Sequence, residues 1–443
     1  MRRILVLLVL FSAAPLAAQQ DREPVGVQLG LQYTVPRRHV AVRPFASSPE
    51  VAEAARLIHG IVERDLDYSD RYQMVLVPEG LAVGPILYGP WNDLGVEFLV
   101  TGEVQRDGEG YVLRLALHDV VYNAVKNIQA FSLPPESSPD FRMSVHAVAD
   151  EVVRWISNEP GMAASRIVAV RSSRGRYELV VVDSDGENLR TIFSTDKILY
   201  SPTWSPDGNR IAYAVGDDEG WNIHERNLRT GETRVLRVRA GAQLLTPAYS
   251  PDGRRIAFGL SMGGNPVIYD YDISQNCCLR RLTSGPGLDV SPTYSPDGRW
   301  IAFNSDRIGQ PHIYTIPADG GEATLITPYT YGQPAYFTSP DWSPTDSMIA
   351  FHGRSRGRFQ IMVVSSRPGS IVYQLTTEGE NEDPSWAPDG RHLVFVSSRG
   401  GGGLYAIDAR TGRERRIVGG GGFRLPDWSP TLKRATTLAA DNP

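Results

Sequence analysis

A short motif recurs six times along the second half of the chain, an aromatic residue followed by Ser-Pro or Ala-Pro. The copies start at steps of 45, 45, 48, 44 and 42 residues, at Trp204, Tyr249, Tyr294, Trp342, Trp386 and Trp428. A period of about 40–50 residues is typical of a β-propeller, in which each repeat folds into one four-stranded blade. The repeat therefore predicts a propeller over residues 165–432, and it favours a binding role over catalysis.

Each repeat has the same internal order. A proline two residues before the aromatic opens it, and Asp-Gly follows Ser-Pro or Ala-Pro in four copies. Proline presets a turn, aspartate bonds to its own backbone, and glycine tolerates the turn exit. Because these aspartates recur with the repeat, we predict that they form turns and do not act as a catalytic acid and base. They are Asp207, Asp252, Asp297 and Asp389.

The two ends of the repeat region complement each other. The last copy, at Trp428, lacks the aliphatic strand that follows the other copies. Strand-like segments that match the missing part precede the first copy, beginning at Arg166 and Tyr177. We therefore expect six blades, with the ring closed by a C-terminal strand that joins the N-terminal strands of the same blade.

Residues 36–160 contain no copy of the repeat. Segments such as HVAVRPF from His39 are typical of buried strands, and the spacing of apolar residues predicts helices from Val51 and from about Pro139 to Ser157. The fold class is therefore α+β and mainly β, with a small N-terminal α/β domain ahead of the propeller. A short tail, 433–443, follows the propeller.

The first 18 residues predict a secretory signal peptide, because two arginines precede an apolar run that ends in small residues. Residues 19–35 lack clear periodicity, so we expect a flexible or pairing-competent arm. The net charge of −5 and the lack of a basic stripe exclude nucleic acid as the main partner. The mature chain should be exported, at most peripheral to membranes, and monomeric.

One segment matches a catalytic motif. Gly259–Gly263 has the pattern Gly-x-Ser-x-Gly, which surrounds the nucleophile of α/β-hydrolases on a strand, a sharp turn and a helix. Here the segment aligns with a blade strand and a second strand follows, so Ser261 is not expected to be catalytic. The histidines lack the spacing of a zinc peptidase, and we expect no cofactor. A divalent cation in the central channel stays open, without assignable ligands.

Cys277 and Cys278 are adjacent and fall between predicted strands. A bond between neighbouring cysteines closes a strained eight-membered ring. We therefore favour two thiols without a role, and a vicinal disulfide is the alternative.

The residues just before each Pro-x-aromatic pattern should rim one face of the propeller. A mixture of aromatic, acidic and amide groups around a concavity suits a protein partner. The candidate partner-binding residues are Leu199, Tyr200, Gln243, Leu244, Asp289, Val290, Tyr336, Asn381, Glu382 and Arg424.

The order of these parts resembles the TolB family, the periplasmic component of the Tol–Pal system. Local matches include VRPF at Val42, WNDLGVEFLVTGEV from Trp91, SRIVAV at Ser165 and DWSPTL from Asp427. The resemblance implies a periplasmic, non-enzymatic adaptor that binds the OmpA-like domain of a peptidoglycan-associated lipoprotein through the propeller face and channel. It also implies a role in outer-membrane integrity and constriction at division.

The family binds a TolA-like inner-membrane protein through a short N-terminal segment. That segment is not recognisable in residues 19–35, where the chain departs from the family pattern. Two alternatives stay open for the function. One is an exported propeller that binds glycans or peptides, and the other is a relative of the prolyl oligopeptidases.

Overall fold

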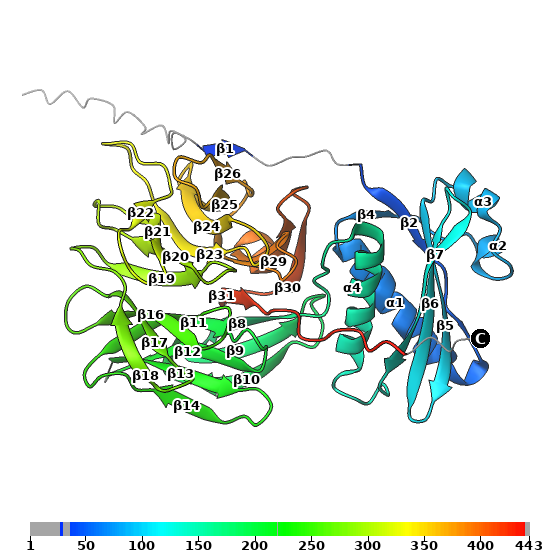
Figure 1. Cartoon of the computed structure of the whole chain (residues 1–443), viewed down its shortest axis with the longest axis horizontal. Coiled ribbons are helices and arrows are strands. Elements are labelled where there is room, and N and C mark those ends of the chain that lie inside the picture. Colours follow the sequence, from blue (N-terminus) through cyan, green and yellow to red (C-terminus); the bar gives the residue numbers. More distant parts are fainter. Residues whose placement is uncertain (1–26, 30–35, 219, 439–443) are drawn as a thin grey trace, which may run out of the picture.

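The computed structural model describes residues 27–29, 36–218 and 220–438 (Figure 1). A small α/β domain lies beside a six-bladed propeller, which confirms the predicted fold class. The predicted signal peptide, most of the predicted arm and residues 439–443 lie outside the described residues. Among the described helices, none has the length and apolar character needed to cross a bilayer.

The N-terminal domain is a mixed sheet with helices on both faces. Its neighbouring strands are β4 (Tyr72–Met74), β2 (Arg38–Val42), β5 (Phe98–Asp107), β6 (Gly110–Asp119) and β7 (Ala124–Leu133), and β3 (Ala46–Ser47) pairs with β5. The β4–β2–β5 pairs are parallel, and the β5–β6–β7 pairs are antiparallel.

Two long helices, α1 (Ala52–Tyr68) and α4 (Phe141–Ser157), pack together on one face of this sheet. Alternate residues of a strand face opposite sides, so Val40 and Val42 join the core beneath these helices while Ala41 faces the other way. There a smaller core around Trp91 lies under α2 (Glu79–Ala82) and α3 (Tyr88–Asp93). A single 3₁₀ turn, η1 (Pro49–Val51), leads into α1.

The second to sixth propeller blades follow one another along the chain, each with its innermost strand first. The second to fourth blades are β11 (Ile198–Trp204), β12 (Arg210–Asp217), β13 (Gly220–Asn227) and β14 (Thr233–Leu236); β15 (Gln243–Tyr249), β16 (Arg255–Ser261), β17 (Val267–Asp272) and β18 (Cys277–Arg281); and β19 (Asp289–Tyr294), β20 (Trp300–Ser305), β21 (His312–Pro317) and β22 (Thr324–Leu325).

The fifth and sixth blades repeat this order. Their strands are β23 (Phe337–Trp342), β24 (Met348–Ser355), β25 (Arg358–Ser365) and β26 (Val372–Gln374); and β27 (Asn381–Trp386), β28 (His392–Ser397), β29 (Gly403–Asp408) and β30 (Glu414–Gly419), with a 3₁₀ turn η2 (Arg399–Gly401) between β28 and β29.

The first blade is built from both ends of the propeller region, as predicted. Its order is β10 (Arg190–Thr195), β9 (Arg176–Asp183), β8 (Arg166–Ser173) and β31 (Phe423–Trp428). The side chain of Trp428, the last residue of β31, is buried. Its indole Nε1–H donates a hydrogen bond to Ser165 Oγ at 2.7 Å. The chain then returns to the N-terminal domain, where Thr437 bridges to Phe131 of β7 (Figure 1).

The Ser-Pro-Asp-Gly and Ala-Pro-Asp-Gly segments form the predicted turns between the first two strands of the second, third, fourth and sixth blades. In the second blade, Asp207 Oδ1 accepts from Ser205 Oγ and from the Asn209 amide. Gly208 closes the turn with its amide on the Ser205 carbonyl and a φ of 68°, a conformation that favours glycine. The third and fourth blades repeat the serine–aspartate bond.

The described part of the arm adds one strand to the propeller. β1 (Val27–Leu29) pairs in parallel with β26 at the outer edge of the fifth blade. This pairing gives that blade a fifth strand and covers part of its exposed edge.

The expectation of two free cysteine thiols is wrong, because Cys277 and Cys278 form a disulfide. Both lie in β18, where the β17–β18 register shifts, and Cys278 has a φ of 64°. In a regular strand, successive side chains face opposite sides. The left-handed backbone at Cys278 breaks this alternation, so two adjacent side chains can meet.

We predict that Trp428→Ala lowers the free energy of unfolding by about 3–5 kcal/mol, because it empties a buried site at the ring closure. Trp300→Ala is the matched control, since Trp300 lies at the start of β20 and is 42% exposed. The control should lose less than about 1 kcal/mol. Urea unfolding followed by circular dichroism measures both values, and equal losses would contradict the closure.

Candidate functional site

The propeller presents two different faces at the two ends of its strands. We call the end at which the innermost strands begin the rim face, and the end that carries the Ser-Pro-Asp-Gly turns the turn face. A narrow cavity of about 120 Å³ runs along the central axis. It is lined by the Pro-x-aromatic segments of the innermost strands, so the rim face surrounds one mouth of this channel.

The structure divides the predicted rim residues into buried and outward-facing sets. The residue three positions before the proline is buried in every blade: Leu199, Leu244, Asp289, Phe337, Asn381 and Phe423. Four of these were candidate partner-binding residues, and their side chains serve the propeller interior instead. Both carboxylate oxygens of Asp289 accept hydrogen bonds from Arg307 Nη2, at 3.0 and 3.1 Å. Asn381 Nδ2 donates a hydrogen bond to Gln360 Oε1 at 3.0 Å.

The remaining candidates are at least partly accessible at the rim face. Tyr200 and Tyr336 are 39% and 40% exposed. Glu382 and Arg424, from neighbouring blades, form an ion pair at 3.6 Å. Val290 is half-buried, and the Gln243 side chain accepts the Trp221 amide at 2.5 Å. The structure thus brings two partly exposed tyrosines and one ion pair to the same face.

Sequence reasoning missed several apolar residues on the same face. They lie at a strand start, in the loops between second and third strands and in a loop that joins two blades. They are Ile198, then Met262 and Ile308, then Tyr329 and Tyr331. Tyr331 is 90% exposed. The signal was present as PYTYGQPAY between β22 and β23, a stretch of three tyrosines without strand alternation.

The channel wall carries carboxylates that belong to the blades' own hydrogen-bond network. Asp427 Oδ2 accepts the Trp204 amide at 2.7 Å, and Asp341 Oδ2 accepts the Trp386 amide at 2.7 Å. Burial, and then the neighbouring Asp341, raises the pKa of Asp427 to about 8. Burial also raises the pKa of Asp341 to about 6. Protonated Asp427 therefore reduces the negative charge of the channel at neutral pH.

The catalytic motif has no catalytic geometry. Ser261 ends β16, and β17 follows after a turn, so the strand–turn–helix of a nucleophile elbow is not formed. Ser261 Oγ donates to the Gly264 carbonyl at 2.5 Å. The residue closes a local turn.

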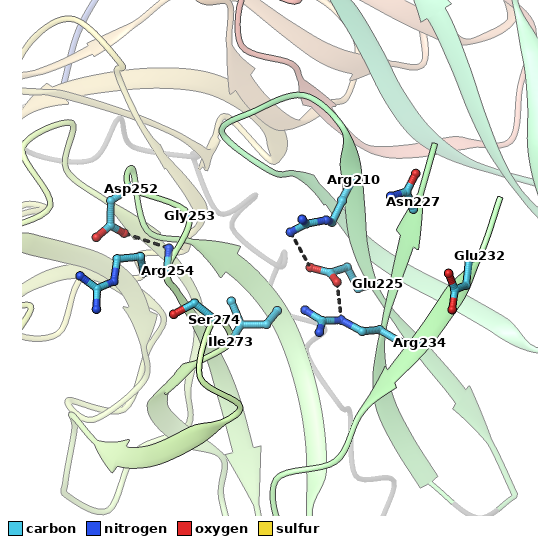
Figure 2. A pocket seen from close by; sticks show the side chains of 10 residues that line it. All are labelled: Arg210, Glu225, Asn227, Glu232, Arg234, Asp252, Gly253, Arg254, Ile273 and Ser274. Atoms are coloured by element: carbon cyan, nitrogen blue, oxygen red, sulfur yellow. Dashed lines mark hydrogen bonds and ion pairs between the residues drawn. The ribbon is translucent and has the colours of Figure 1, made fainter. Parts of the chain in front are cut away.

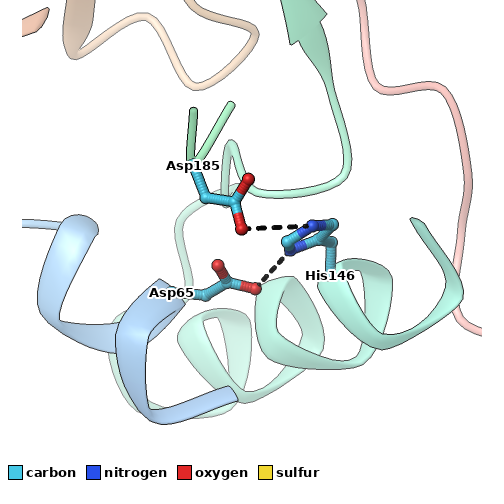
Figure 3. Close-up of side chains that lie close together, drawn as sticks. All are labelled: Asp65, His146 and Asp185. Atoms are coloured by element: carbon cyan, nitrogen blue, oxygen red, sulfur yellow. Dashed lines mark hydrogen bonds and ion pairs between the residues drawn. The ribbon is translucent and has the colours of Figure 1, made fainter. Parts of the chain in front are cut away.

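At the turn face, the N-terminal domain packs against the first and sixth blades through two buried histidines. Figure 3 shows the first, where His146 of α4 lies between Asp65 of α1 and Asp185 of the β9–β10 turn. His146 Nδ1 lies 2.7 Å from Asp65 Oδ2, and its Nε2 lies 3.8 Å from Asp185 Oδ2. Arg64 and Arg142 also donate to Asp185 Oδ2, at 2.6 and 2.5 Å.

The second cluster centres on His392 at the start of β28. Its Nδ1 lies 2.8 Å from Asp389 Oδ2, and its Nε2 lies 3.2 Å from Asp70 Oδ2 of the N-terminal domain. With both ring nitrogens facing carboxylates, the doubly protonated ring satisfies both. Burial alone would lower the pKa of His392, but Asp389, Asp70 and Asp408 raise it above its usual value.

Arginines surround this second cluster from both domains. Arg71 Nη1 lies 3.2 Å from Asp389 Oδ2, and Arg415 Nη1 lies 3.3 Å from Asp70 Oδ2. Arg391 Nη2 donates to the Asp70 carbonyl at 3.1 Å. Asp389 is therefore a turn former, as predicted, and also an inter-domain anchor.

These are the two groups of described residues whose spacing could hold a metal ion. Their oxygens are already engaged by histidine and arginine, and a cation would have to displace guanidinium groups. We assign both to domain packing. Within the described residues, no comparable group of ligands lies in the channel.

Comparison with known proteins identifies the family. A model described as the TolB beta propeller domain matches residues 154–432, and one described as the TolB amino-terminal domain matches residues 33–125. The chain belongs to the TolB family. This confirms the resemblance drawn from the order of the motifs.

Individual relatives agree with this assignment. The Tol-Pal system protein TolB of Methylococcus capsulatus is 32% identical over 235 residues, 51% of this chain and 53% of that relative. The one from Anaeromyxobacter sp. is 36% identical over 232 residues, 50% of this chain and 52% of that relative. The chain thus aligns with about half the length of these curated relatives. They are named as system components, in line with the prediction of a non-enzymatic protein.

A solved structure matches nearly the whole architecture. The crystal structure of TolB from Acinetobacter baumannii has a TM-score of 0.78 and 27% sequence identity. The match covers 89% of this chain and 97% of that chain. Both domains of the fold are therefore shared within the TolB family.

We predict that the stability contributed by His392 depends on pH. The pKa of His392 is higher in the folded chain than in the unfolded chain, where it is about 6.5. The stabilising contribution is therefore fully present below the pKa of the unfolded chain, and it is lost as pH rises through the pKa of the folded chain. His392→Gln should therefore cost about 3 kcal/mol or more at pH 6, and less at pH 9.

Urea unfolding at both pH values measures this difference. His39→Gln is the control, because His39 lies on the exposed part of β2. A cost of His392→Gln that is equal at pH 6 and pH 9 would rule out a protonated ring at the domain interface.

Proposed function

We propose that this TolB-family protein is a periplasmic, non-enzymatic adaptor that binds a peptidoglycan-associated lipoprotein through the rim face of its propeller. In this role it supports outer-membrane integrity and constriction during division. The partner is the soluble OmpA-like domain of the lipoprotein, bound by a monomer of the chain.

The single observation that carries the proposal is the exposed aromatic set on the rim face. Tyr200 at the start of β11 and Tyr331 and Tyr336 in the β22–β23 loop lie on the rim face and expose 39%, 90% and 40% of their surface. Tyrosine supplies large contact area at low entropic cost and is enriched at the energetic centres of interfaces. The described part of the N-terminal domain packs against the first and sixth blades at the turn face, the end opposite to the rim face.

Charge adds specificity to this surface. Glu382 and Arg424 are partly exposed at neighbouring positions and pair only at 3.6 Å, so each retains hydrogen-bonding capacity for a partner. A polar rim around aromatic anchors is the usual composition of a reversible protein interface.

A TolA-like partner for residues 19–35 is part of the proposal. β1 pairs with β26 through backbone hydrogen bonds, which shows that this segment can add to a sheet. The same backbone groups suit pairing with a strand of a partner.

We predict that Tyr336→Ala weakens binding of the OmpA-like domain from the same genome by about tenfold or more, because it removes an aromatic anchor. Isothermal titration calorimetry with the mature chain measures the affinity. Trp300→Ala is the matched control, since it removes an exposed aromatic on the turn face. A tight wild-type complex that neither variant weakens would move the interface away from the rim.

Absence of any binding would contradict the adaptor role. In that case, titration with peptidoglycan fragments and short peptides tests the remaining interpretation, an exported propeller that binds glycans or peptides.

A further inference from the structure

A groove opens on the turn face between the second and third blades, outside the first and sixth blades that carry the two histidine clusters. It has a volume of about 570 Å³, and Figure 2 shows the side chains that line it. Arg210 and Arg234 flank the carboxylate of Glu225 from opposite sides (Figure 2). The turn of the third blade, with Arg254 and then Ile273 and Ser274, forms the opposite wall.

The propeller contains an internal reference for this groove, because the next gap between blades has residues of the same charge at equivalent positions. In the third blade, Asp270 lies opposite Arg280 in the β17–β18 register, as Glu225 lies opposite Arg234 in β13–β14. Arg255 begins β16 as Arg210 begins β12. The two gaps can therefore be compared residue by residue.

In the gap between the third and fourth blades, the arginines and the acids are all paired. Arg255 binds Asp270 with two bonds, at 2.6 and 2.8 Å. Arg280 binds Asp270 at 2.7 and 3.1 Å, and it also binds Asp319 Oδ1 at 3.0 Å and the Ala318 carbonyl at 2.8 Å, both from the next blade. This gap is smaller, at about 260 Å³.

The groove between the second and third blades keeps only one of these six hydrogen bonds. Ser274 stands where the next gap has Asp319, since the Ile273 and Ala318 amides make the same bond to the preceding turn. Arg234 binds Glu225 through Nε alone, at 2.5 Å. Arg210 reaches only 3.9 Å from Glu225, and its guanidinium makes no hydrogen bond to a described residue.

Glu225 does not compensate for the missing acid. It is buried, and its Oε1, the oxygen nearest Arg210, accepts a hydrogen bond from the Tyr249 hydroxyl at 2.7 Å. Asp252 is engaged in its own turn by Ser250 Oγ and the Arg254 amide. The groove therefore presents the Arg210 guanidinium and the Nη groups of Arg234 without hydrogen-bond acceptors among the described residues, beside the apolar Ile273 and with Glu232 at its edge.

We propose that this groove binds an acidic side chain of a peptide segment, which takes the place that Asp319 holds in the neighbouring gap. The carboxylate accepts hydrogen bonds from Arg234 and Arg210, as guanidinium groups favour. Glu232 accepts from backbone N–H groups of the same segment, and this selects a peptide over a simple anion. The site lies on the turn face, so it can be occupied independently of the rim.

The test is a titration of the full mature chain, with ¹⁵N-labelled arginine followed by NMR. The probe is the acetylated and amidated peptide Pro-Ala-Asp-Gly-Gly, the chain's own sequence at 317–321. We expect saturable shifts of the Arg210 and Arg234 Nε–H signals, and no shift of Arg280, whose acceptors are already in place. Ser274→Asp should weaken this binding about tenfold, because it supplies the missing carboxylate from within.

Two further arms define the ligand. The same peptide with Asn in place of Asp should not bind, and sodium acetate at equal concentration should shift these signals less than the Asp peptide does. No saturable shift up to about 10 mM peptide would overturn the proposal. The proposal would also be overturned if the Asn peptide or acetate shifted the Arg210 and Arg234 signals as much as the Asp peptide does. The same holds if Ser274→Asp bound the Asp peptide as tightly as the unchanged chain.

Discussion

Every innermost strand of the propeller is interrupted at the same point, and the rest of the structure depends on this interruption. The residue before the proline has a φ between 43° and 56° in all six blades, although none of the six is glycine. Such a backbone costs of the order of 1–3 kcal/mol per residue. The register shift that it creates directs the side chain that follows the proline, such as Asp427, to the backbone amide of the neighbouring blade. These bonds join the blades around the channel.

The interruption also separates the two faces. On one side of it the strand starts form the rim face, where tyrosines and the Glu382–Arg424 pair are open to a partner. On the other side the tight turns form the turn face, where Asp389 and Asp185 anchor the N-terminal domain through His392 and His146. A binding surface and a domain interface thus share one rigid ring, and neither needs the other's side chains.

The period of the aromatic motif was sufficient to predict the blades and their closure, because each strand and turn is encoded within a few residues. The period was not sufficient to predict which residues of the rim face are exposed. Strand alternation buries Leu199 and Asn381 and turns their neighbours Tyr200 and Glu382 outward, and applying this alternation to the candidates would have separated them. The histidine clusters could not be predicted, since Asp70 and His392 are distant in sequence and meet only when two domains pack. The disulfide depends on a single left-handed residue, Cys278.

The central claim is that the rim face is the binding surface. Hydrogen–deuterium exchange of the full chain, with and without the OmpA-like domain of the lipoprotein, tests it most directly. The account predicts slower exchange at the strand starts and blade-joining loops, residues 198–200, 329–337 and 381–382, and no change in the turns at 205–208 and 250–253. Protection confined to the N-terminal domain or to those turns would contradict it.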